Sequence, residues 1–222
     1  DTLGLGLRNA FPTSFVAPTG DSVLFQLAGG ALPGFEGAGT NDLWQAIRED
    51  PAGWTTTHPS PSGSQSTHQT PDAVTADHRF AFWRVGGQGS LIPEGASRAE
   101  YLRAPDGSFV LVGLGSLGQD LNPQVHYTAP GGQYILFSSS THLEPQAPSN
   151  HATIYRRSLG EEVTEVISLL PGEQTAAANA TYRGASTDGS IVAFHVGNQL
   201  YVLVGNEKTL AVGPAGTTYA GI

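Results

Sequence analysis

The sequence predicts an all-β protein built from tandem copies of a small antiparallel sheet, and three observations support this. The 29 glycines and 15 prolines are spread along all 222 residues, which is typical of many short strands joined by turns. A segment with a turn, an apolar run and a phenylalanine recurs four times. In its last copy, Ile191, Ala193 and His195 fall on one face and the residues between them on the other, as in a strand.

The four copies have a regular spacing. Their phenylalanines are Phe25, Phe82, Phe137 and Phe194, which lie 57, 55 and 57 residues apart. Self-similarity at a fixed period is the sequence signature of a repeat architecture. The four copies read TGDSVLFQL, ADHRFAFWRV, GGQYILFSS and DGSIVAFHV.

Each repeat contains three further strand-like segments. One precedes the phenylalanine segment and reads SFVAP, DAVTA, HYTAP or YRGAS. The next follows it as NDLWQA, AEYLRA, ATIYRR or NQLYVL, with Trp44, Leu102, Tyr155 and Tyr201 as anchors. The last follows a tight turn and reads WTTTH, SFVLV, VTEVISLL or TLAV. Each repeat therefore predicts four strands, A to D in chain order. Residues 43–48 have a helical pattern, but their counterparts are strand-like, so we predict a strand there too.

Tandem four-stranded antiparallel sheets are the blades of a β-propeller, in which each sheet packs between its neighbours around a central axis. An unrelated β-sandwich would not require equivalent positions to recur at this spacing. We therefore predict a single β-propeller domain or segment with four blades of about 55 residues. The expected blades span about 11–62, 71–118, 124–172 and 180–215, and a further blade begins at 216–222.

Both ends of the chain predict an incomplete ring. The C-terminal GTTYAGI matches strand A of the fourth blade, and the N-terminal DTLGLGL looks like the end of a strand D. The four blades are therefore expected to be an excerpt of a larger ring, and a closed four-bladed ring is the alternative. An open segment would expose two apolar sheet faces. We accordingly expect self-association or further blades that complete the ring.

These units resemble the WD40-like repeats of the TolB type (PD40), whose blades carry a DG turn, an apolar strand with Phe and a later strand with Tyr. The match is best over residues 186–201 and good over 130–155, whereas Thr19–Asp21 and Ala76–His78 replace the expected DG turn. The resemblance implies a β-propeller with an extracellular, periplasmic or cell-surface location. It implies little about function, because such repeats occur in scaffolds, secreted proteins and enzyme-appended domains.

Composition restricts the classes of partner. The 10 basic residues against 19 acidic ones give a net charge of −9, so the chain lacks the basic surface that a nucleic-acid binder needs. Cysteine is missing, and no apolar stretch approaches the length of a membrane-spanning helix. We therefore expect no nucleic-acid partner, no membrane span and no thiolate metal site.

Residues 109–118, FVLVGLGSLG, have the glycine spacing of a dinucleotide-binding turn. Such a turn requires a helix that begins at the glycines and an acidic residue about 20 positions later. Pro123 and a β-rich segment follow instead, so we assign Phe109–Val112 to strand D and the glycines to the crossover into the third blade. Walker, G-x-S-x-G, H-E-x-x-H and EF-hand motifs are also missing from the sequence. No cofactor is expected.

The loops between strands B and C form the predicted binding surface. They run from Leu27 to Asn41, from Val85 to Glu100 and from Ser139 to Thr153, which is longer than strand connection requires. In a propeller these loops share one face with the D–A crossovers. Extra length on one face favours a binding role, and flexible decoration is the structural alternative. The candidate binding residues are Glu36, Glu94, Glu100, His142, Glu144 and His151.

Three functions are open at this point. The preferred one is a non-catalytic binding or scaffold module for a protein or glycan partner. The second is an enzyme, since Glu36, Glu94 or Glu144 could pair as carboxylates for glycoside cleavage if they converged in one cleft. The third is a structural spacer. His142 and Glu144 with His151 could also ligate a divalent metal, but the sequence does not fix their geometry.

Other conspicuous residues receive structural interpretations. Asp106 and Asp188 open Asp-Gly turns, in which the side chain bonds nearby amides and glycine takes a positive φ. His195 follows the anchor Phe194 and is expected to be packed and hydrogen-bonded. The tryptophans, expected in the core or between blades, are Trp44, Trp54 and Trp83.

Overall fold

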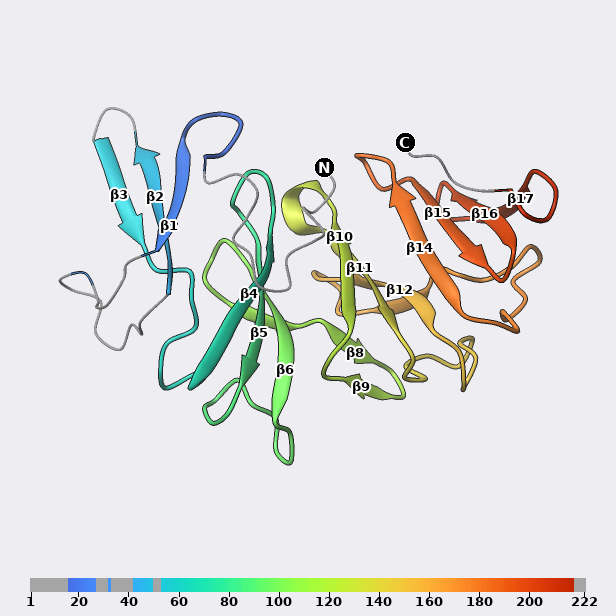
Figure 1. Ribbon diagram of the computed structural model, residues 1–222, viewed down its shortest axis with the longest axis horizontal. Helices are drawn as coiled ribbons and strands as arrows, with labels where there is room; N and C mark the ends of the chain where they lie inside the picture. Colours follow the sequence, from blue (N-terminus) through green and yellow to red (C-terminus); the bar gives the residue numbers. More distant parts are fainter. Residues whose placement is uncertain (1–15, 27–31, 33–41, 50–52, 218–222) are drawn as a thin grey trace. The chain divides into compact units, whose positions relative to one another are not determined.

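A computed structural model of the chain describes residues 16–26, 32, 42–49 and 53–217 (Figure 1). Within these residues it contains 17 β-strands, one short 3₁₀ turn, η1 (Pro130–Gly132), and no α-helix. Every strand pairing is antiparallel. The predicted all-β class is therefore confirmed. This described part holds no helix with the length and apolar character needed to cross a membrane.

The strands form four sheets and one hairpin, and each sheet is a meander of consecutive strands. Sheet 1 contains β1 (Ser22–Gln26), β2 (Leu43–Glu49) and β3 (Gly53–Thr57). Sheet 2 contains β4 (His68–Val74), β5 (Ala81–Gly86), β6 (Arg98–Arg103) and β7 (Phe109–Leu111). Sheet 3 contains β10 (Gln124–Thr128), β11 (Tyr134–Ser139), β12 (Thr153–Ser158) and β13 (Thr164–Val166). Sheet 4 contains β14 (Ala180–Ala185), β15 (Ile191–Val196), β16 (Gln199–Val204) and β17 (Lys208–Val212).

Three of the sheets thus have the four strands that the repeat predicts. Sheet 1 has three, and an isolated antiparallel bridge between Val16 and Val23 stands where its strand A was expected. The helical pattern of residues 43–48 does not produce a helix, because β2 covers them. The repeat was therefore a better guide to this segment than its local periodicity.

The glycine-rich stretch after β7 forms an additional hairpin that the sequence did not predict. β8 (Gly113–Gly115) pairs with β9 (Gly118–Asp120), so this stretch is more than a plain crossover. The hairpin is attached to sheet 3, because the carbonyl oxygen of Leu114 accepts a hydrogen bond from the hydroxyl of Thr164 at 2.5 Å.

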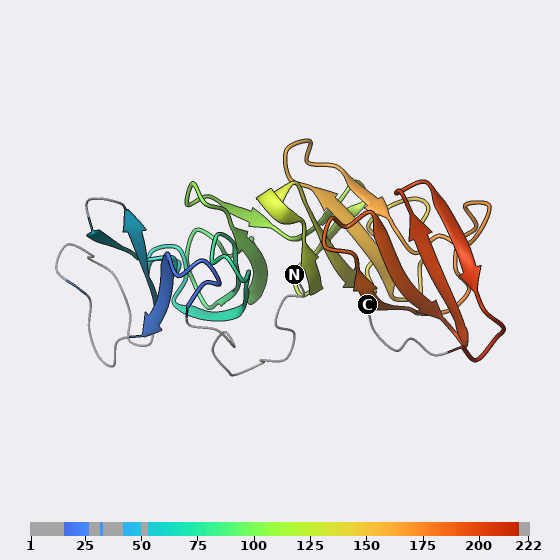
Figure 2. The ribbon, with the colours of Figure 1, turned by 90° about the horizontal axis from the view of Figure 1, so that it is seen from above.

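The chain divides into two compact units. The described residues up to Leu111 form the first unit, which contains sheets 1 and 2. Those from Val112 on form the second unit, which contains the β8–β9 hairpin and sheets 3 and 4. In the second unit, sheets 3 and 4 lie side by side with their faces toward each other (Figure 2).

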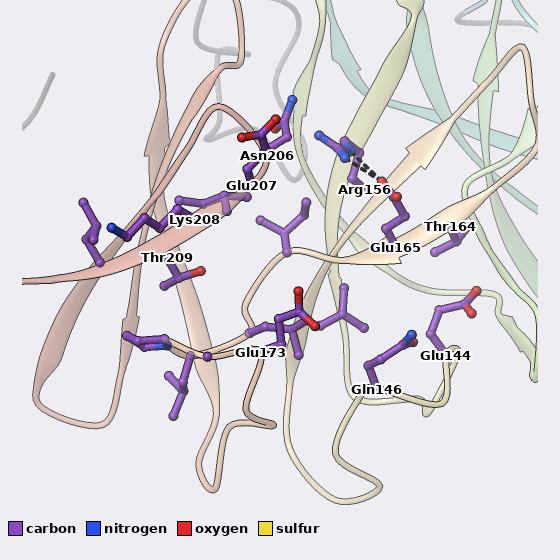
Figure 3. A pocket seen from close by; sticks show the side chains of 18 of the residues that line it. Glu144, Gln146, Arg156, Thr164, Glu165, Glu173, Asn206, Glu207, Lys208 and Thr209 are labelled. Carbon is purple, nitrogen blue, oxygen red and sulfur yellow. Dashed lines mark hydrogen bonds and ion pairs between the residues drawn. The ribbon is translucent and has the colours of Figure 1, made fainter.

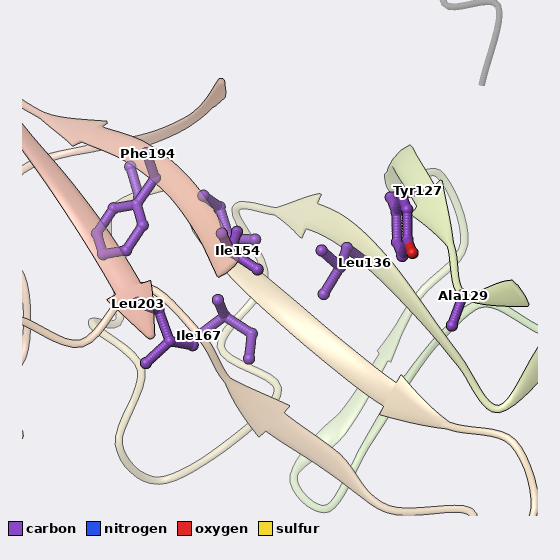
Figure 4. Close-up of a cluster of buried hydrophobic side chains, with 9 residues drawn as sticks. Tyr127, Ala129, Leu136, Ile154, Ile167, Phe194 and Leu203 are labelled. Atoms are coloured by element: carbon purple, nitrogen blue, oxygen red, sulfur yellow. The ribbon is translucent and has the colours of Figure 1, made fainter. Parts of the chain in front are cut away.

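The core of the second unit lies between sheets 3 and 4 (Figure 4). Leu136 and Ile154 of sheet 3 pack against Phe194 and Leu203 of sheet 4, and burial of each such side chain contributes roughly 1.5–3 kcal/mol. We call the face of sheet 3 that carries Leu136 its leading face and the face of sheet 4 that carries Phe194 its trailing face. The cluster consists of Tyr127, Ala129, Leu136, Ile154, Ile167, Ala180, Val192, Phe194 and Leu203.

The same type of turn precedes strand B of every repeat, which is β1, β5, β11 or β15. In each turn, a residue with positive φ donates its backbone N–H to the carbonyl oxygen three residues earlier, at 2.7–2.9 Å. Side chains disfavour positive φ, which explains why three of the four residues are glycine. These turn residues are Gly20 (φ 72°), His78 (58°), Gly132 (72°) and Gly189 (67°).

The aspartates of the Asp-Gly turns act as predicted. Asp188 accepts hydrogen bonds from the backbone N–H of Ser190 (3.1 Å) and from the hydroxyl of Ser186 (2.6 Å). These hydroxyl and amide donors lower the pKa of Asp188 to about 2. Asp106 likewise accepts hydrogen bonds from the hydroxyl (2.7 Å) and the backbone N–H (2.9 Å) of Ser108, and these donors lower its pKa. Their structural role is therefore confirmed.

The turn residue also determines which aromatic side chain anchors each sheet. Five residues after it lies an aromatic residue that pairs with an aromatic residue on the next strand. In sheet 2 this rule places Trp83 opposite Tyr101, so the predicted anchors Phe82 and Leu102 are wrong by one residue. The cross-strand pairs are Phe25–Trp44, Trp83–Tyr101, Phe137–Tyr155 and Phe194–Tyr201.

The tryptophan prediction is correct for two residues and wrong for the third. Trp44 and Trp83 are fully buried, whereas Trp54 is 53% exposed. Trp54 lies on β3, the last strand in the order of sheet 1. A strand at the edge of a sheet is covered by one neighbour only, so its side chains are less buried than those of a central strand.

Gly189→Ala tests the turn. We expect it to lower the free energy of unfolding by about 2–4 kcal/mol, because alanine disfavours positive φ and its Cβ would lie 1.5 Å from the hydroxyl of Tyr134. Gly172→Ala is the matched control, since Gly172 has φ 77° but nothing within 4 Å of the added Cβ. Urea unfolding should show at least about 1 kcal/mol more destabilisation for Gly189→Ala. Equal losses for both variants would contradict the expected clash with Tyr134.

Candidate functional site

The predicted binding residues do not all lie on loops. Glu36 falls outside the described residues. Glu94 is exposed between β5 and β6, as expected of a loop residue. Glu100, in contrast, lies within β6 and is only 1% exposed, so its assignment to a loop is wrong. The remaining candidates, all between β11 and β12, are His142, Glu144 and His151.

Glu144 holds its loop against the β8–β9 hairpin. One carboxylate oxygen accepts a hydrogen bond from the backbone N–H of Ser116 (2.8 Å), and the other accepts from the Ser116 hydroxyl (2.6 Å). Beside this contact, the N–H of Leu117 bonds the carbonyl oxygen of Leu143 at 3.0 Å. The approach requires glycine, since a Cβ on Gly115 would lie 2.5 Å from that carbonyl oxygen. Glu144 is therefore a structural tie between the loop and the hairpin.

The candidate metal ligands are not brought together. Among the residues that the structure describes, no group of three or more His, Cys, Asp and Glu side chains could hold a metal ion. Glu144 is engaged by Ser116. The Nε2 of His142 is buried and has no hydrogen-bond partner in the described part of the chain. The structure thus gives no support to a site formed by His142, Glu144 and His151.

Glu100 occupies a position that is apolar in every other sheet. It pairs with Arg84, which follows the anchor aromatic residue of sheet 2. The equivalent residues of sheets 1, 3 and 4 are Leu43, Ile154 and Leu200. All four positions are buried. A carboxyl group therefore stands where the repeat otherwise places an aliphatic side chain.

Two charged side chains accompany Glu100. Asp72 on β4 forms an ion pair with Arg84 on β5, and Arg84 Nε lies 3.6 Å from a carboxylate oxygen of Glu100. Burial, and then the negative charge of Asp72, raise the pKa of Glu100 to about 9, while Arg84 opposes this shift. The negative charge of Asp72 favours the protonated form of Glu100, although neither carboxyl oxygen of Glu100 has a hydrogen-bond partner among the described residues. Glu100 is therefore a neutral carboxylic acid at pH 7.

Glu100→Gln tests this assignment. Because the pKa of Glu100 is about 9 in the folded state, against an ordinary value of 4.5 for glutamate, the folded state binds its proton more tightly. The unmodified protein should therefore lose stability as the pH rises from 4.5 toward 9. Glutamine imitates the protonated acid, so the variant should be more stable at pH 7, by up to about 3 kcal/mol, and equal near pH 4.5. Urea unfolding across this range checks it, with the exposed Glu94→Gln as control. A less stable Glu100→Gln at pH 7 would show that the ionised form is preferred.

A polar pair recurs at one place in sheets 2, 3 and 4. The first strand of each has a β-bulge six residues before the turn residue. A bulge leaves one residue without a partner on the neighbouring strand and redirects its side chain. In each sheet this residue interacts with the residue twelve positions later. The pairs are Asp72–Arg84, His126–Ser138 and Arg183–His195.

The histidines of these pairs have different surroundings. His126 bonds Ser138 at 2.7 Å, and its ring stacks on that of Tyr182 with centroids 4.5 Å apart. Burial lowers the pKa of His126 to about 4, so it is neutral at pH 7. Burial and then the positive charge of Arg183 lower the pKa of His195. The Nε2 of His195 is buried without a hydrogen-bond partner among the described residues, so the hydrogen bond predicted for this histidine is missing at that atom.

A groove of about 780 Å³ lies between sheets 3 and 4 in the second unit (Figure 3). One wall is β13 with the following segment up to Glu173, and the other is the β16–β17 hairpin. β13 has three residues and β17 has five. Beyond β13 the N–H of Ile167 still bonds the carbonyl oxygen of Ile154 on β12 at 2.8 Å.

The groove combines an aliphatic lining with an acidic rim. Arg156 and Glu165 form an ion pair between β12 and β13, visible in Figure 3. Lys208 and three more glutamates also line the groove, so acidic side chains outnumber basic ones. None of the described residues that line it is aromatic. The main aliphatic residues are Val166, Ile167, Leu169, Leu170, Leu203 and Leu210.

The first unit has a smaller groove at the equivalent place. It measures about 380 Å³ and lies between β3 and the β6–β7 turn. Thr56, Thr57, Arg103 and Phe109 are among the residues that line it, and burial lowers the pKa of Arg103. The two grooves therefore flank equivalent strands of the repeat.

No protein family model matches the sequence, and no curated protein matches it. The resemblance to TolB-type repeats therefore stays a prediction. Function is inferred from the geometry of the grooves and of the sheet faces.

Sequence reasoning missed both the groove and the setting of Glu100. Of the predicted binding residues that the structure describes, Glu144 alone lines the groove. The sequence VTEVISLL predicted a longer strand than β13 and gave no sign of the groove beside it. The position of Glu100 could have been recognised by aligning the repeats on Trp83, because that alignment places it with three aliphatic residues. The one-residue error in the second repeat concealed the difference.

Proposed function

We propose that the chain forms part of a β-propeller and serves as a non-catalytic binding module for a protein or glycan partner. The observation that carries this proposal is the groove between β13 and the β16–β17 hairpin. Its volume of about 780 Å³ falls within the range of ligand sites. Strands β12, β13, β16 and β17 form part of its walls together with the connecting segments, and the strand residues favour a defined binding geometry.

The free face of sheet 4 supports the propeller. Ile191, Val204, Leu210 and Val212 share the leading face of sheet 4, and each is 37–42% exposed. The leading face of sheet 3 is instead buried against sheet 4. Soluble proteins seldom leave a contiguous apolar face uncovered. A further sheet packed on this face, as sheet 4 packs on sheet 3, would bury it.

The chain after sheet 4 repeats the connection seen before it. The N–H of Ala180, the first residue of β14, bonds the carbonyl oxygen of Ala152 just before β12 (2.8 Å). The N–H of Gly216 bonds the carbonyl oxygen of Asn198, the equivalent residue just before β16 (2.7 Å). Of the predicted strand A at residues 216–222, only Gly216 and Thr217 lie within the described residues.

We also propose an exported setting, at the cell surface, in the periplasm or outside the cell. The resemblance to TolB-type repeats implies this location, and the net charge of −9 without cysteine is compatible with it. The same charge argues against nucleic acid as a partner.

Thr209→Arg tests the groove as a binding site. Thr209 lies on β17, lines the groove and shares the trailing face with Leu203, so a long cationic side chain there should fill the space. Ligands selected for the unmodified protein from a random peptide library and a glycan array should bind this variant at least tenfold more weakly in titration calorimetry. Thr55→Arg is the matched control, because Thr55 is exposed on an outer strand and lines neither groove. Selected ligands that bind Thr209→Arg unchanged would refute the groove as the site.

The double variant Val204→Glu/Val212→Glu tests the leading face of sheet 4. Both side chains are exposed on that face and outside the groove. The unmodified protein should self-associate as its concentration rises, because association buries the apolar face, and the variant should stay monomeric. Sedimentation velocity measures this, with circular dichroism to show that the variant is folded. If the unmodified protein stayed monomeric over the whole concentration range, this would contradict the proposal that the leading face of sheet 4 packs against another sheet.

A further inference from the structure

We infer that the groove takes an extended peptide with basic and aliphatic side chains, which adds to the free edge of β17 as a fifth strand of sheet 4. The inference rests on the proposed binding function and names the class of partner. Addition of a strand to an exposed sheet edge is an established mode of peptide recognition, in which main-chain hydrogen bonds give affinity and side-chain pockets give specificity.

β17 has the properties of an unprotected edge. It is the last strand in the order of sheet 4 and pairs with β16 in a regular register over all five residues. Natural edges are usually blocked by short length, proline, a bulge or several charges. β17 lacks proline and bulges, and Lys208, at its first position, is its one charged residue. The corresponding strands β7 and β13 are protected by their length of three residues each.

The groove lies along one face of β17, next to the edge where a strand would be added. Thr209 pairs with Leu203, which belongs to the core between sheets 3 and 4, so this face of β17 is the one that lines the groove. Successive side chains of a strand point to opposite faces of its sheet. Alternate side chains of a strand added to β17 would therefore project over the aliphatic lining, and the others would lie on the leading face.

The charges select the composition of the peptide. Figure 3 shows Glu173, Glu207 and Lys208 at the rim of the groove. Neither Glu173 nor Glu207 has an ion-pair partner in the described part of the chain, whereas Arg156 is held by Glu165. Basic side chains on the partner would meet these free carboxylates, and charge complementarity of this kind favours correct association. Within the described part of the chain, the lining offers no aromatic ring against which a sugar could stack, so a peptide is favoured over a glycan.

The probe for this inference is a fluorescein-labelled peptide of alternating lysine and valine. Titration of the full chain, followed by fluorescence anisotropy, should show saturable binding. A glutamate–valine peptide of equal length should not bind, because its charge is reversed. Methylation of the lysine–valine backbone nitrogens along one edge should weaken binding at least tenfold, since it removes the donors that pair with β17. Hydrogen exchange of the amides of residues 208–212 should slow when the peptide is bound, while that of β3 stays unchanged.

Matched charge variants complete the test. Glu173→Lys/Glu207→Lys should weaken binding of the lysine–valine peptide at least tenfold. Glu94→Lys/Glu161→Lys changes the net charge equally at exposed positions outside the groove and should bind as the unmodified protein does. Failure to bind the peptide, equal binding of the glutamate–valine peptide, or binding without slower exchange in β17 would each overturn the inference. If groove ligands of another class then lose affinity in Thr209→Arg, the proposed binding function stands although the peptide does not.

Discussion

The turn residue with positive φ sets the register on which the rest of each sheet depends. It stands six residues after the bulge and five residues before the anchor aromatic residue, so it fixes which side chains meet across the strands. Glycine satisfies this requirement at little cost in three sheets. In sheet 2 the position is taken by His78, whose Nδ1 lies 3.0 Å from the Ser22 hydroxyl and whose carbonyl oxygen accepts a hydrogen bond from Gln45. These contacts offset a backbone cost of about 1–2 kcal/mol.

The same turn also connects neighbouring sheets. In the second unit, the carbonyl oxygens of Thr187 and Asp188 accept hydrogen bonds from Tyr127 (2.8 Å) and Tyr134 (3.4 Å) of the preceding sheet. In the first unit, His78 contacts Ser22 of the preceding sheet. One turn therefore determines both the register within a sheet and its attachment to the sheet before it. This dual role explains why the spacing of the turns is nearly constant although the loops between strands differ in length.

The sequence predicts the strand order and pairing that depend on this turn, but it does not predict features that depend on contacts between distant residues. Strand order and the antiparallel sheets follow from the spacing of turn and apolar segments, so their prediction is confirmed. The predicted anchor residue of sheet 2 is wrong by one position. Phe80, Phe82 and Trp83 lie so close together in the sequence that the apolar pattern does not distinguish between them. The β8–β9 hairpin is held by hydrogen bonds between residues far apart in the sequence, from Thr164 to Leu114 and from Ser116 to Glu144. The groove lies between β13, the segment after it and the β16–β17 hairpin, and apolar composition does not encode how these elements meet.

Both units contain polar or concave features that the repeat does not require. In the second unit the groove lies between β13 and the β16–β17 hairpin. In the first unit Glu100 replaces an aliphatic residue in the core, beside Asp72 and Arg84. Keeping a neutral carboxyl group in that position reduces stability at neutral pH, since the ordinary pKa of glutamate is 4.5 and the unfolded chain would release this proton. A change to leucine would restore the pattern of the other sheets. Stabilising changes of this kind are readily found, and polar departures from a consistent pattern are commonly located at functional or strained sites.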